Sequence, residues 1–576
     1  MTENKANIIT ILDPAYSECY EIIMKPLKDD IITLYSCILV NRSFCRVFIP
    51  VLWRNPFKFI IDDNKLIKLI NTLIHCLNST IKNDLINKDS IKLEGLPTYF
   101  KYHTLIKEFD LNPLQRGIRL WTSSHLTQKL TRRSISRRVF KINKYIGNLL
   151  FDKENQYNSL NIYHNELLNG LRTLFDICKF DNYEKSLVQV NKLSVGFFHG
   201  NTTNLILPIT ENFLKLQNKL SPNIQHLQIS IDTIKEHEEF SRNLIHFIKS
   251  QKKLKSLITN TFWIKDDFIQ PFLNSLKNQS TCLTFLKLQD QKLSNELLLS
   301  ILKSLPNLIT LYLDINYLEY RVNEGNSFYS IISQIYFNNL ENLYYDLKSK
   351  IFWNTWNAWS SISDPDPSNL LFNQILLSSS KLFSIKVKIN NGFIKYLQSY
   401  QHQHLTHLHI ILDSDSLENL IKLLKNLRHL IYLKLDDYYE RSKDRLLRYN
   451  YYTFLQFAQT IPNSLRIFEI NFEITNGYLE TLFNETQLNI QCIKLYHYIH
   501  CNTSLRVFID YAKSKKCFKE LGITYNIMKS ISKDYIIEAK NYFNVTPFNN
   551  DEINIPFYDD PIKNSYWSRR VKEGRV

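Results

Sequence analysis

Four histidines fall close together in this 576-residue chain, in the stretch QHQHLTHLH at 401–409. Imidazole is a good zinc ligand, and in an extended strand the alternate residues His407 and His409 point to the same side. No carboxylate or cysteine lies nearby in the sequence to complete a metal site. The leucines between the histidines fit the buried positions of a repeat. We therefore interpret His407 and His409 as residues of a binding surface, and we expect neither a metal nor a cofactor.

The residue types needed for catalysis show no pattern typical of an enzyme. Glycine-rich phosphate loops need several closely spaced glycines, whereas this chain has 11 glycines in total and contains neither GxGxxG nor GxxxxGK[ST]. Serine, histidine and aspartate are present without a nucleophile–base arrangement. The nine cysteines include no CxxC pair, which favours free thiols over a zinc ribbon or a disulfide framework. We expect a protein that is not an enzyme.

The stretch QRGIRLWTSSHLTQKLTRRSISRRVFKINKYIGNLL (115–150) contains nine Lys and Arg residues and no acidic residue. It could contact phosphates or act as a nuclear-import signal, and Arg132-Arg133-x-x-Ser136 could be a kinase site. A solvated basic face accounts for the same residues, and we favour that interpretation. The net charge of +16 over the whole chain permits acidic partners without requiring nucleic acid.

Three tryptophans in FWNTWNAWSSISDPDPS (352–368), namely Trp353, Trp356 and Trp359, recur every third residue and share one face of a helical turn. Clustered aromatic residues are typical of an interface anchor. Packing of a repeat helix onto its neighbour uses the same spacing, and we favour packing.

The N-terminal segment from Ser17 to Phe57 contains three short apolar stripes at helical spacing. The acidic pair Asp29-Asp30 is a plausible helix start because negative charge favours a helix N-terminus, and Pro56 ends the third stripe. Three short helices form too small a core to be independently robust. Such a unit typically needs a partner that covers its remaining apolar face.

The pieces ECYEII (18–23), Asp29-Asp30 and LYSCILVNRSFCRVFIPVLWRNPF (34–57) together resemble an F-box. In the best-matching part, Phe44 stands where the family usually has tryptophan. The resemblance implies binding to a Skp-type adaptor and, through it, to a cullin–RING ubiquitin ligase. The residues to which it assigns adaptor binding are Leu12, Pro14, Ile22, Ile23, Leu34, Ile38, Leu39, Val40, Arg42 and Phe44.

A repeat organises the rest of the chain. The stretch CLTFLKLQDQKLSNELLLSILKSLPNLITLYLDINYL (282–318) contains LxxLxL twice, with an amphipathic segment from Leu297 to Leu305 between them. With apolar substitutions the motif begins at Val190, Ile224, Leu254, Leu283, Leu308, Leu340, Leu382, Leu405, Leu430, Leu465, Ile490 and Phe518. Stacked strand–helix units of this type predict an α/β leucine-rich-repeat solenoid, with parallel strands inside and helices outside.

We predict four regions: an F-box-like helical domain (10–57), a helical linker with degenerate early repeats (58–185), the solenoid (186–545) and a C-terminal tail (546–576). Helices are expected over Ile67–Leu77 and Leu150–Phe175. The N-terminus has no secretory signal, and no apolar stretch is long enough for a membrane span. We expect a cytoplasmic or nuclear location.

The combination resembles the leucine-rich-repeat F-box proteins and implies a non-catalytic substrate receptor of a ubiquitin ligase, which captures a protein target on its concave face. Charged residues at the inner positions are balanced in sign, which suits a protein target better than nucleic acid. The predicted target-binding residues are Lys287, Tyr312, Asp314, Tyr344, Lys386, Lys388, His407, His409, Tyr432, Lys434, Glu469 and Tyr496. The alternatives are a non-enzymatic scaffold with a vestigial F-box and a nucleic-acid-associated factor that uses the basic stretch.

Overall fold

The structure is a computed structural model. It describes residues 24, 27, 30–58, 60, 62–89, 91, 93, 98, 100–125, 131–165, 177, 180, 182–198, 215–216, 219–220, 222–231, 238–261, 266–319, 334–347, 367–388, 397, 404–412, 417–437, 451–472, 474–485, 489–496 and 501–548. The chain divides into two compact units, Met1–Leu283 and Thr284–Val576.

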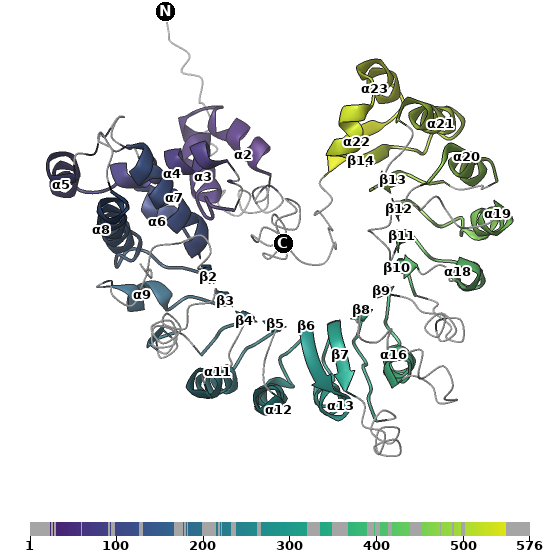
Figure 1. Cartoon of the computed structure of the whole chain (residues 1–576), viewed down its shortest axis with the longest axis horizontal. Helices are drawn as coiled ribbons and strands as arrows, with labels where there is room; N and C mark the ends of the chain where they lie inside the picture. Colours follow the sequence, from purple (N-terminus) through teal and green to yellow (C-terminus); the bar gives the residue numbers. More distant parts are fainter. Residues whose placement is uncertain are drawn as a thin grey trace, which may run out of the picture. The chain divides into compact units, whose positions relative to one another are not determined.

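The first unit begins with helices and continues as strand–helix repeats (Figure 1). Its described elements are α2 (Ile31–Ile38), α3 (Arg42–Leu52), α4 (Asp63–His75), α5 (Ser79–Asp89), α6 (Tyr102–Leu105), β1 (Glu108–Asp110), α7 (Leu111–Ser124), α8 (Arg132–Leu150), β2 (Ser159–Asn165), α9 (Tyr183–Leu187), β3 (Lys192–Phe198), β4 (His226–Ile231), α11 (Glu238–Ser250), β5 (Ser256–Thr261), α12 (Asp266–Leu276) and the 3-10 turn Lys277–Gln279. Strands β1 to β5 pair in chain order and in parallel.

The second unit repeats the strand–helix pattern throughout. Its described elements are β6 (Phe285–Ser294), α13 (Asn295–Ser304), β7 (Thr310–Glu319), β8 (Asn342–Leu347), α16 (Pro367–Leu377), β9 (Ser384–Lys388), β10 (His407–Leu412), α18 (Leu417–Leu424), β11 (Tyr432–Asp437), α19 (Tyr451–Thr460), β12 (Ile467–Asn471), α20 (Asn476–Glu485), β13 (Cys492–Leu495), α21 (Cys501–Ser514), β14 (Glu520–Thr524), α22 (Tyr525–Ser530), α23 (Lys533–Lys540) and β15 (Asn544–Phe548). Strands β6 to β15 also pair in chain order and in parallel.

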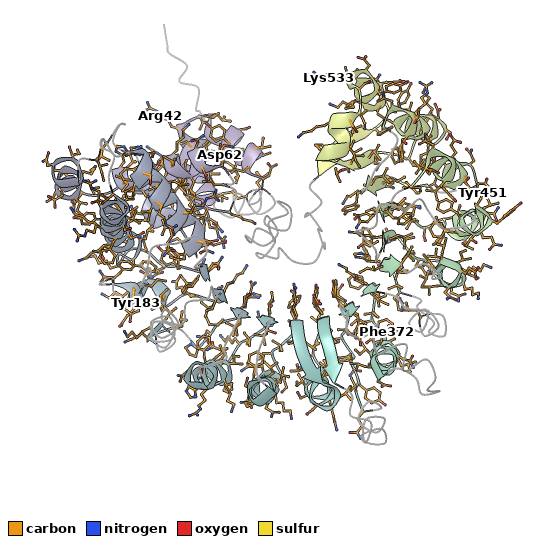
Figure 2. The ribbon with its side chains drawn as sticks, in the orientation of Figure 1. Arg42, Asp62, Tyr183, Phe372, Tyr451 and Lys533 are labelled. Carbon is orange, nitrogen blue, oxygen red and sulfur yellow. The ribbon has the colours of Figure 1, made fainter. Side chains whose placement is uncertain are left out.

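The leucine-rich-repeat architecture predicted from the motif is confirmed. Every one of the twelve motif positions lies two residues before the start of a strand, from Val190 before β3 to Phe518 before β14. Within β6 the leucines Leu286 and Leu288 are fully buried. The core lies between strands and helices, as Figure 2 shows for Phe372 of α16, which is buried and contacts the ring of Tyr345 in β8.

Three strands were missed by the motif search, and one helix prediction was wrong. Strand β2 lies inside Leu150–Phe175, which we had expected to be helical, and α8 ends at Leu150. The reason is tertiary: β2 pairs with β3 over its whole length, and Tyr157 and Leu160 supply buried apolar positions. Strand β1, the shortest, and β15 likewise follow degenerate versions of the motif.

The first two described helices, α2 and α3, pack against each other through an apolar core that includes Leu34, Phe48 and Ile49. Each helix begins at a side-chain cap. The Asp30 carboxylate accepts a hydrogen bond from the Thr33 N–H (3.0 Å), as the predicted acidic start implied. The Asn41 side chain accepts one from the Phe44 N–H (2.8 Å) and so starts α3.

Arg54 and Asn55, which follow α3, contact the first residue of the edge strand β1. The Arg54 carbonyl accepts hydrogen bonds from the N–H groups of Lys107 (2.9 Å) and Glu108 (3.0 Å). The Glu108 carboxylate in turn accepts bonds from Arg54 Nε and Asn55 Nδ2, each at 3.0 Å. An uncovered edge strand exposes unpaired backbone groups and invites aggregation. The N-terminal helices are therefore anchored to the repeat through this edge.

Candidate protein-binding face

The sheet of the second unit carries one continuous row of polar and aromatic side chains on the face opposite its leucine core. Cross-strand register aligns one residue from each of eight neighbouring strands. We name this set the central row: Lys287, Tyr312, Tyr344, Lys386, His409, Lys434, Glu469 and Lys494. Parallel strands lie about 4.8 Å apart, which is close enough for long side chains on neighbouring strands to contact each other.

The first half of the central row is a stack of two tyrosine rings with a lysine at each end. The rings of Tyr312 and Tyr344 are parallel within 4° with their centroids 3.6 Å apart. The Lys287 ammonium lies 4.3 Å from the centre of the Tyr312 ring, and the Lys386 ammonium lies 4.4 Å from that of Tyr344. Both tyrosines and Lys386 are half-buried. Tyrosine is one of the residue types enriched in the hot spots of protein interfaces, and the two lysines hold the rings in place through cation–π contacts.

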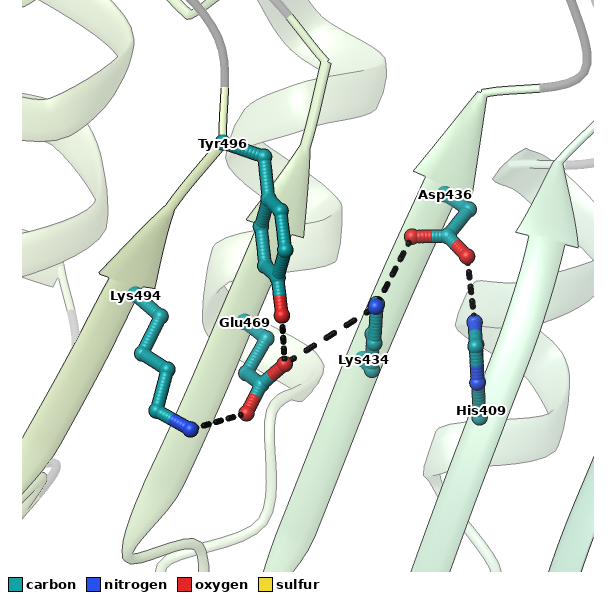
Figure 3. A network of polar contacts seen from close by, with 6 residues as sticks. All are labelled: His409, Lys434, Asp436, Glu469, Lys494 and Tyr496. Atoms are coloured by element: carbon teal, nitrogen blue, oxygen red, sulfur yellow. Dashed lines mark hydrogen bonds and ion pairs between the residues drawn. The ribbon is translucent and has the colours of Figure 1, made fainter. Parts of the chain in front are cut away.

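The second half of the row forms a buried polar network, drawn in Figure 3. His409 Nε2 lies 2.5 Å from Asp436 Oδ2, and the Lys434 ammonium lies 3.6 Å from Asp436 Oδ1. On its other side the Lys434 ammonium lies 3.9 Å from Glu469 Oε2. Lys434 thus links two carboxylates that come from neighbouring strands.

Glu469 is the most connected group of the network. Its carboxylate accepts hydrogen bonds from the Lys494 ammonium (2.9 Å) and the Tyr496 hydroxyl (2.7 Å). Lys434 also lies over the Tyr496 ring, 4.3 Å from its centre. Buried charges are tolerated only when they are paired and hydrogen-bonded in this way.

Burial and neighbouring charges set the protonation states in the network. Burial, reinforced by the ammonium of Lys386, lowers the pKa of His409 to about 4, so the imidazole is neutral at pH 7. Burial alone would raise the pKa of Asp436, but the hydrogen bond from His409 and the positive charges of Lys434 and Lys386 hold it below its ordinary value. Burial and the Glu469 carboxylate raise the pKa of Tyr496, whose hydroxyl stays protonated.

Several of the residues predicted to bind a target have buried side chains. Cross-strand neighbours cover the side chains, because each strand of the parallel sheet places a long polar residue at the same height. The buried members are Lys287, Asp314, His409, Lys434, Glu469 and Tyr496. The partly accessible members are Tyr312, Tyr344, Lys386, His407 and Tyr432. The side chain of Lys388 lies outside the described residues.

The histidines serve packing and hydrogen bonding in the described structure. His407 stacks on Tyr432 with ring centroids 5.6 Å apart and lies edge-on to Phe383. Its Nδ1 is 2.8 Å from the Thr406 hydroxyl. Where the structure is described, no group of three or more His, Cys, Asp or Glu residues is arranged to hold a metal ion.

A second surface, which we name the α2 face, lies at the N-terminus and consists of Ile31, Ile32, Tyr35, Leu39 and Val40. These apolar side chains are exposed, with 77% of Ile32, 69% of Leu39 and 63% of Val40 open to solvent.

The residues predicted to bind an adaptor divide into three groups. Leu39, Val40 and Arg42 are exposed, and Ile38 and Phe44 are half-buried. Leu34 is buried, which corrects its assignment to a docking surface: it packs inside the α2–α3 pair. Leu12, Pro14, Ile22 and Ile23 lie outside the described residues, as do the three tryptophans at 353, 356 and 359.

Sequence reasoning missed Ile32, because it falls between the apolar stripes that the helical spacing assigns to the core. Only the packing of α2 on α3 shows which side of α2 stays open.

No protein-family model and no curated protein matches the chain. Among solved structures, the chain is similar to the leucine-rich repeat-containing protein LegL7 from Legionella pneumophila, with 16% identity over 60% of this chain and 98% of that one, at a TM-score of 0.32. It is also similar to a protein from Bacteroides fragilis, with 11% identity over 70% of this chain and 78% of that one, at a TM-score of 0.21.

None of the helices in the described part of the chain is long and apolar enough to cross a bilayer.

Proposed function

We propose that this protein is a non-catalytic substrate receptor of a ubiquitin ligase. Its α2 face binds a Skp-type adaptor of a cullin–RING ligase, and the accessible part of its central row holds a protein target. The proposal joins the F-box resemblance of residues 34–57 to the repeat architecture of the rest of the chain. Transfer of ubiquitin belongs to another subunit, and this protein contributes proximity.

The single observation that carries the proposal is the exposed α2 face. Burying one large aliphatic side chain contributes about 1.5–3 kcal/mol. Ile32, Leu39 and Val40 lie together on a helix and the turn that follows it, and this clustering is typical of an interaction site. The α2–α3 pair is small, and a partner on this face would complete its core.

Charging the α2 face tests adaptor binding. Because Leu39 is exposed, Leu39→Asp should leave the melting temperature of the full chain within about 2 °C, since exposed changes stay within about 0.5 kcal/mol. It should abolish co-precipitation of the adaptor and cullin, because the partner would bury an unpaired carboxylate. Ile537→Asp is the matched control: Ile537 in α23 is 63% exposed and should not affect capture. Adaptor capture that survives Leu39→Asp contradicts the proposal.

A scaffold without ligase partners is the second candidate, since the central row alone would suffice for it. Affinity purification of the wild-type chain separates the two functions. Recovery of an adaptor and a cullin with the target supports the receptor. Recovery of a target alone, lost on Tyr344→Ala and retained on Leu39→Asp, supports the scaffold.

A further inference from the structure

The longest helix of the first unit, α8, has two contrasting faces. Val139, Ile142, Ile146 and Leu150 are buried on one face and contribute to the core beside α7. The opposite face presents Arg137, Phe140, Lys144 and Asn148, all exposed and spaced three to four residues apart. We name these four residues the α8 stripe. Phe140, which lies near the centre of the α8 stripe, is 54% exposed.

The α8 stripe is strongly cationic. Arg138 and Lys141 flank it, half-exposed, and the stretch 115–150 contains no acidic residue. Within the described part of the chain, neither Arg137 nor Lys144 forms an ion pair. At a rise of 1.5 Å per residue, these two cations are about 10 Å apart along the helix axis, with Phe140 between them. Lys141 also lies over the Tyr145 ring, 5.7 Å from its centre.

From this pattern we propose that the α8 stripe binds single-stranded nucleic acid. Proteins that bind single strands without sequence preference combine cations along the phosphate backbone with an aromatic side chain on which a base stacks. Arg137 and Lys144, with Arg138 and Lys141 beside them, supply the cations. Phe140 supplies the stacking surface, and the Asn148 amide offers a donor and an acceptor to a base edge.

Two other anionic partners fit the helix less well. A helix that lies in a membrane interface inserts a broad apolar face, whereas the apolar face of α8 is buried in the protein. An acidic polypeptide would gain little from exposed ion pairs, each of which contributes about 0–1 kcal/mol. A nucleic-acid strand releases condensed counterions when cations neutralise its phosphates.

The test measures fluorescence anisotropy of a labelled 20-nucleotide oligothymidylate titrated with the full chain at several salt concentrations. Four phosphate contacts predict a slope of log K against log salt of about −2.8, from about −0.7 per contact. Arg137→Gln/Lys144→Gln should weaken binding and reduce the slope by about 1.4. Phe140→Ala should weaken binding about five-fold or more without changing the slope.

Matched controls distinguish a local site on α8 from the effect of removing any two exposed charges or any exposed apolar side chain. Lys422→Gln/Lys425→Gln removes two exposed charges at and just after α18, and Ile537→Ala removes an exposed apolar group from α23. Neither should change the affinity. No binding at 50 mM salt, or equal loss in the charge control, overturns the proposal. The proposal is also overturned if Phe140→Ala leaves binding unchanged and polyglutamate competes as well as unlabelled oligothymidylate does. That result assigns the stripe to an acidic polypeptide.

Discussion

The network around Glu469 makes a sharp prediction about stability. The Glu469 side chain is 5% exposed and that of Lys434 is 3% exposed. Glu469→Gln keeps the shape and removes the charge, which leaves the Lys434 ammonium with Asp436 as its remaining carboxylate. Breaking a buried ion pair from one side costs about 3–5 kcal/mol when the remaining charge has no other partner. Because Asp436 still pairs with Lys434, we expect a cost of about 1–3 kcal/mol. Lys494 is 30% exposed and can turn to water.

The magnitude therefore comes mainly from Lys434, and further substitutions test this. In Glu469→Gln/Lys434→Met/Asp436→Asn the buried cation is replaced by an apolar side chain of similar length and neither carboxylate is left without its lysine. At least about 1 kcal/mol of stability should therefore return. The exposed Glu480 of α20 provides the control, and Glu480→Gln should stay within about 0.5 kcal/mol.

Urea-dependent hydrogen exchange is the suitable assay, because two units need not unfold in one step. Repeats couple mainly to their neighbours, so the loss of protection should centre on β11 to β13. A destabilisation below about 1 kcal/mol for Glu469→Gln refutes the reasoning. So does a triple variant that is less stable than Glu469→Gln alone.

Three further predictions concern the core, the pH response and glycine packing. Leu311→Ala should lower the free energy of unfolding by about 2–5 kcal/mol because Leu311 is fully buried. Tyr312→Ala should lower it by about 1–2 kcal/mol, because the variant loses the ring contacts with Tyr344 and Lys287. Equal losses in urea unfolding would contradict this. The pKa of His409 is about 4, below its ordinary 6.5, so between these pH values the unfolded chain binds a proton that the folded chain does not. The contribution of neutral His409 to the free energy of unfolding should therefore be fully present above pH 6.5 and fall by up to about 3 kcal/mol as the pH drops to 4. His409→Gln should flatten this decline in pH-dependent melting. Gly147→Ala should destabilise by about 1–3 kcal/mol because its methyl group would overlap the Phe180 ring, whereas Gly477→Ala in open space in α20 should stabilise by about 0.5–1 kcal/mol, both checked by melting temperature.

The position of most strands followed from local pattern alone. In a strand the side-chain period is two, so LxxLxL places Leu286 and Leu288 on the buried side wherever the unit stacks. The same holds from Val190 to Phe518 despite irregular spacing, because insertions fall in the connections between elements. The helix cap at Asp30 could also be predicted from the sequence, because its hydrogen bond reaches only three residues along the chain.

Burial of the polar face was decided only by tertiary structure. His409 and Asp436 are 27 positions apart, and Glu469 meets Lys494 and Tyr496 across further strand-to-strand connections. The motif fixes the register between neighbouring strands, whereas the depth at which each side chain is covered depends on how its cross-strand neighbours pack. Inward-facing charges predicted to be open for a target are therefore partly satisfied within the protein.

The ends of the repeat show the same division. The sequence by itself determined that residues 34–57 form short amphipathic helices, because apolar spacing and capping are local properties. Which side of α2 remains open was decided by its packing on α3, since both sides carry apolar residues: Leu34 is buried, and Ile32 and Leu39 are not. The role of Arg54 and Asn55 depended on an edge strand more than fifty residues away, whose unpaired N–H groups needed an acceptor.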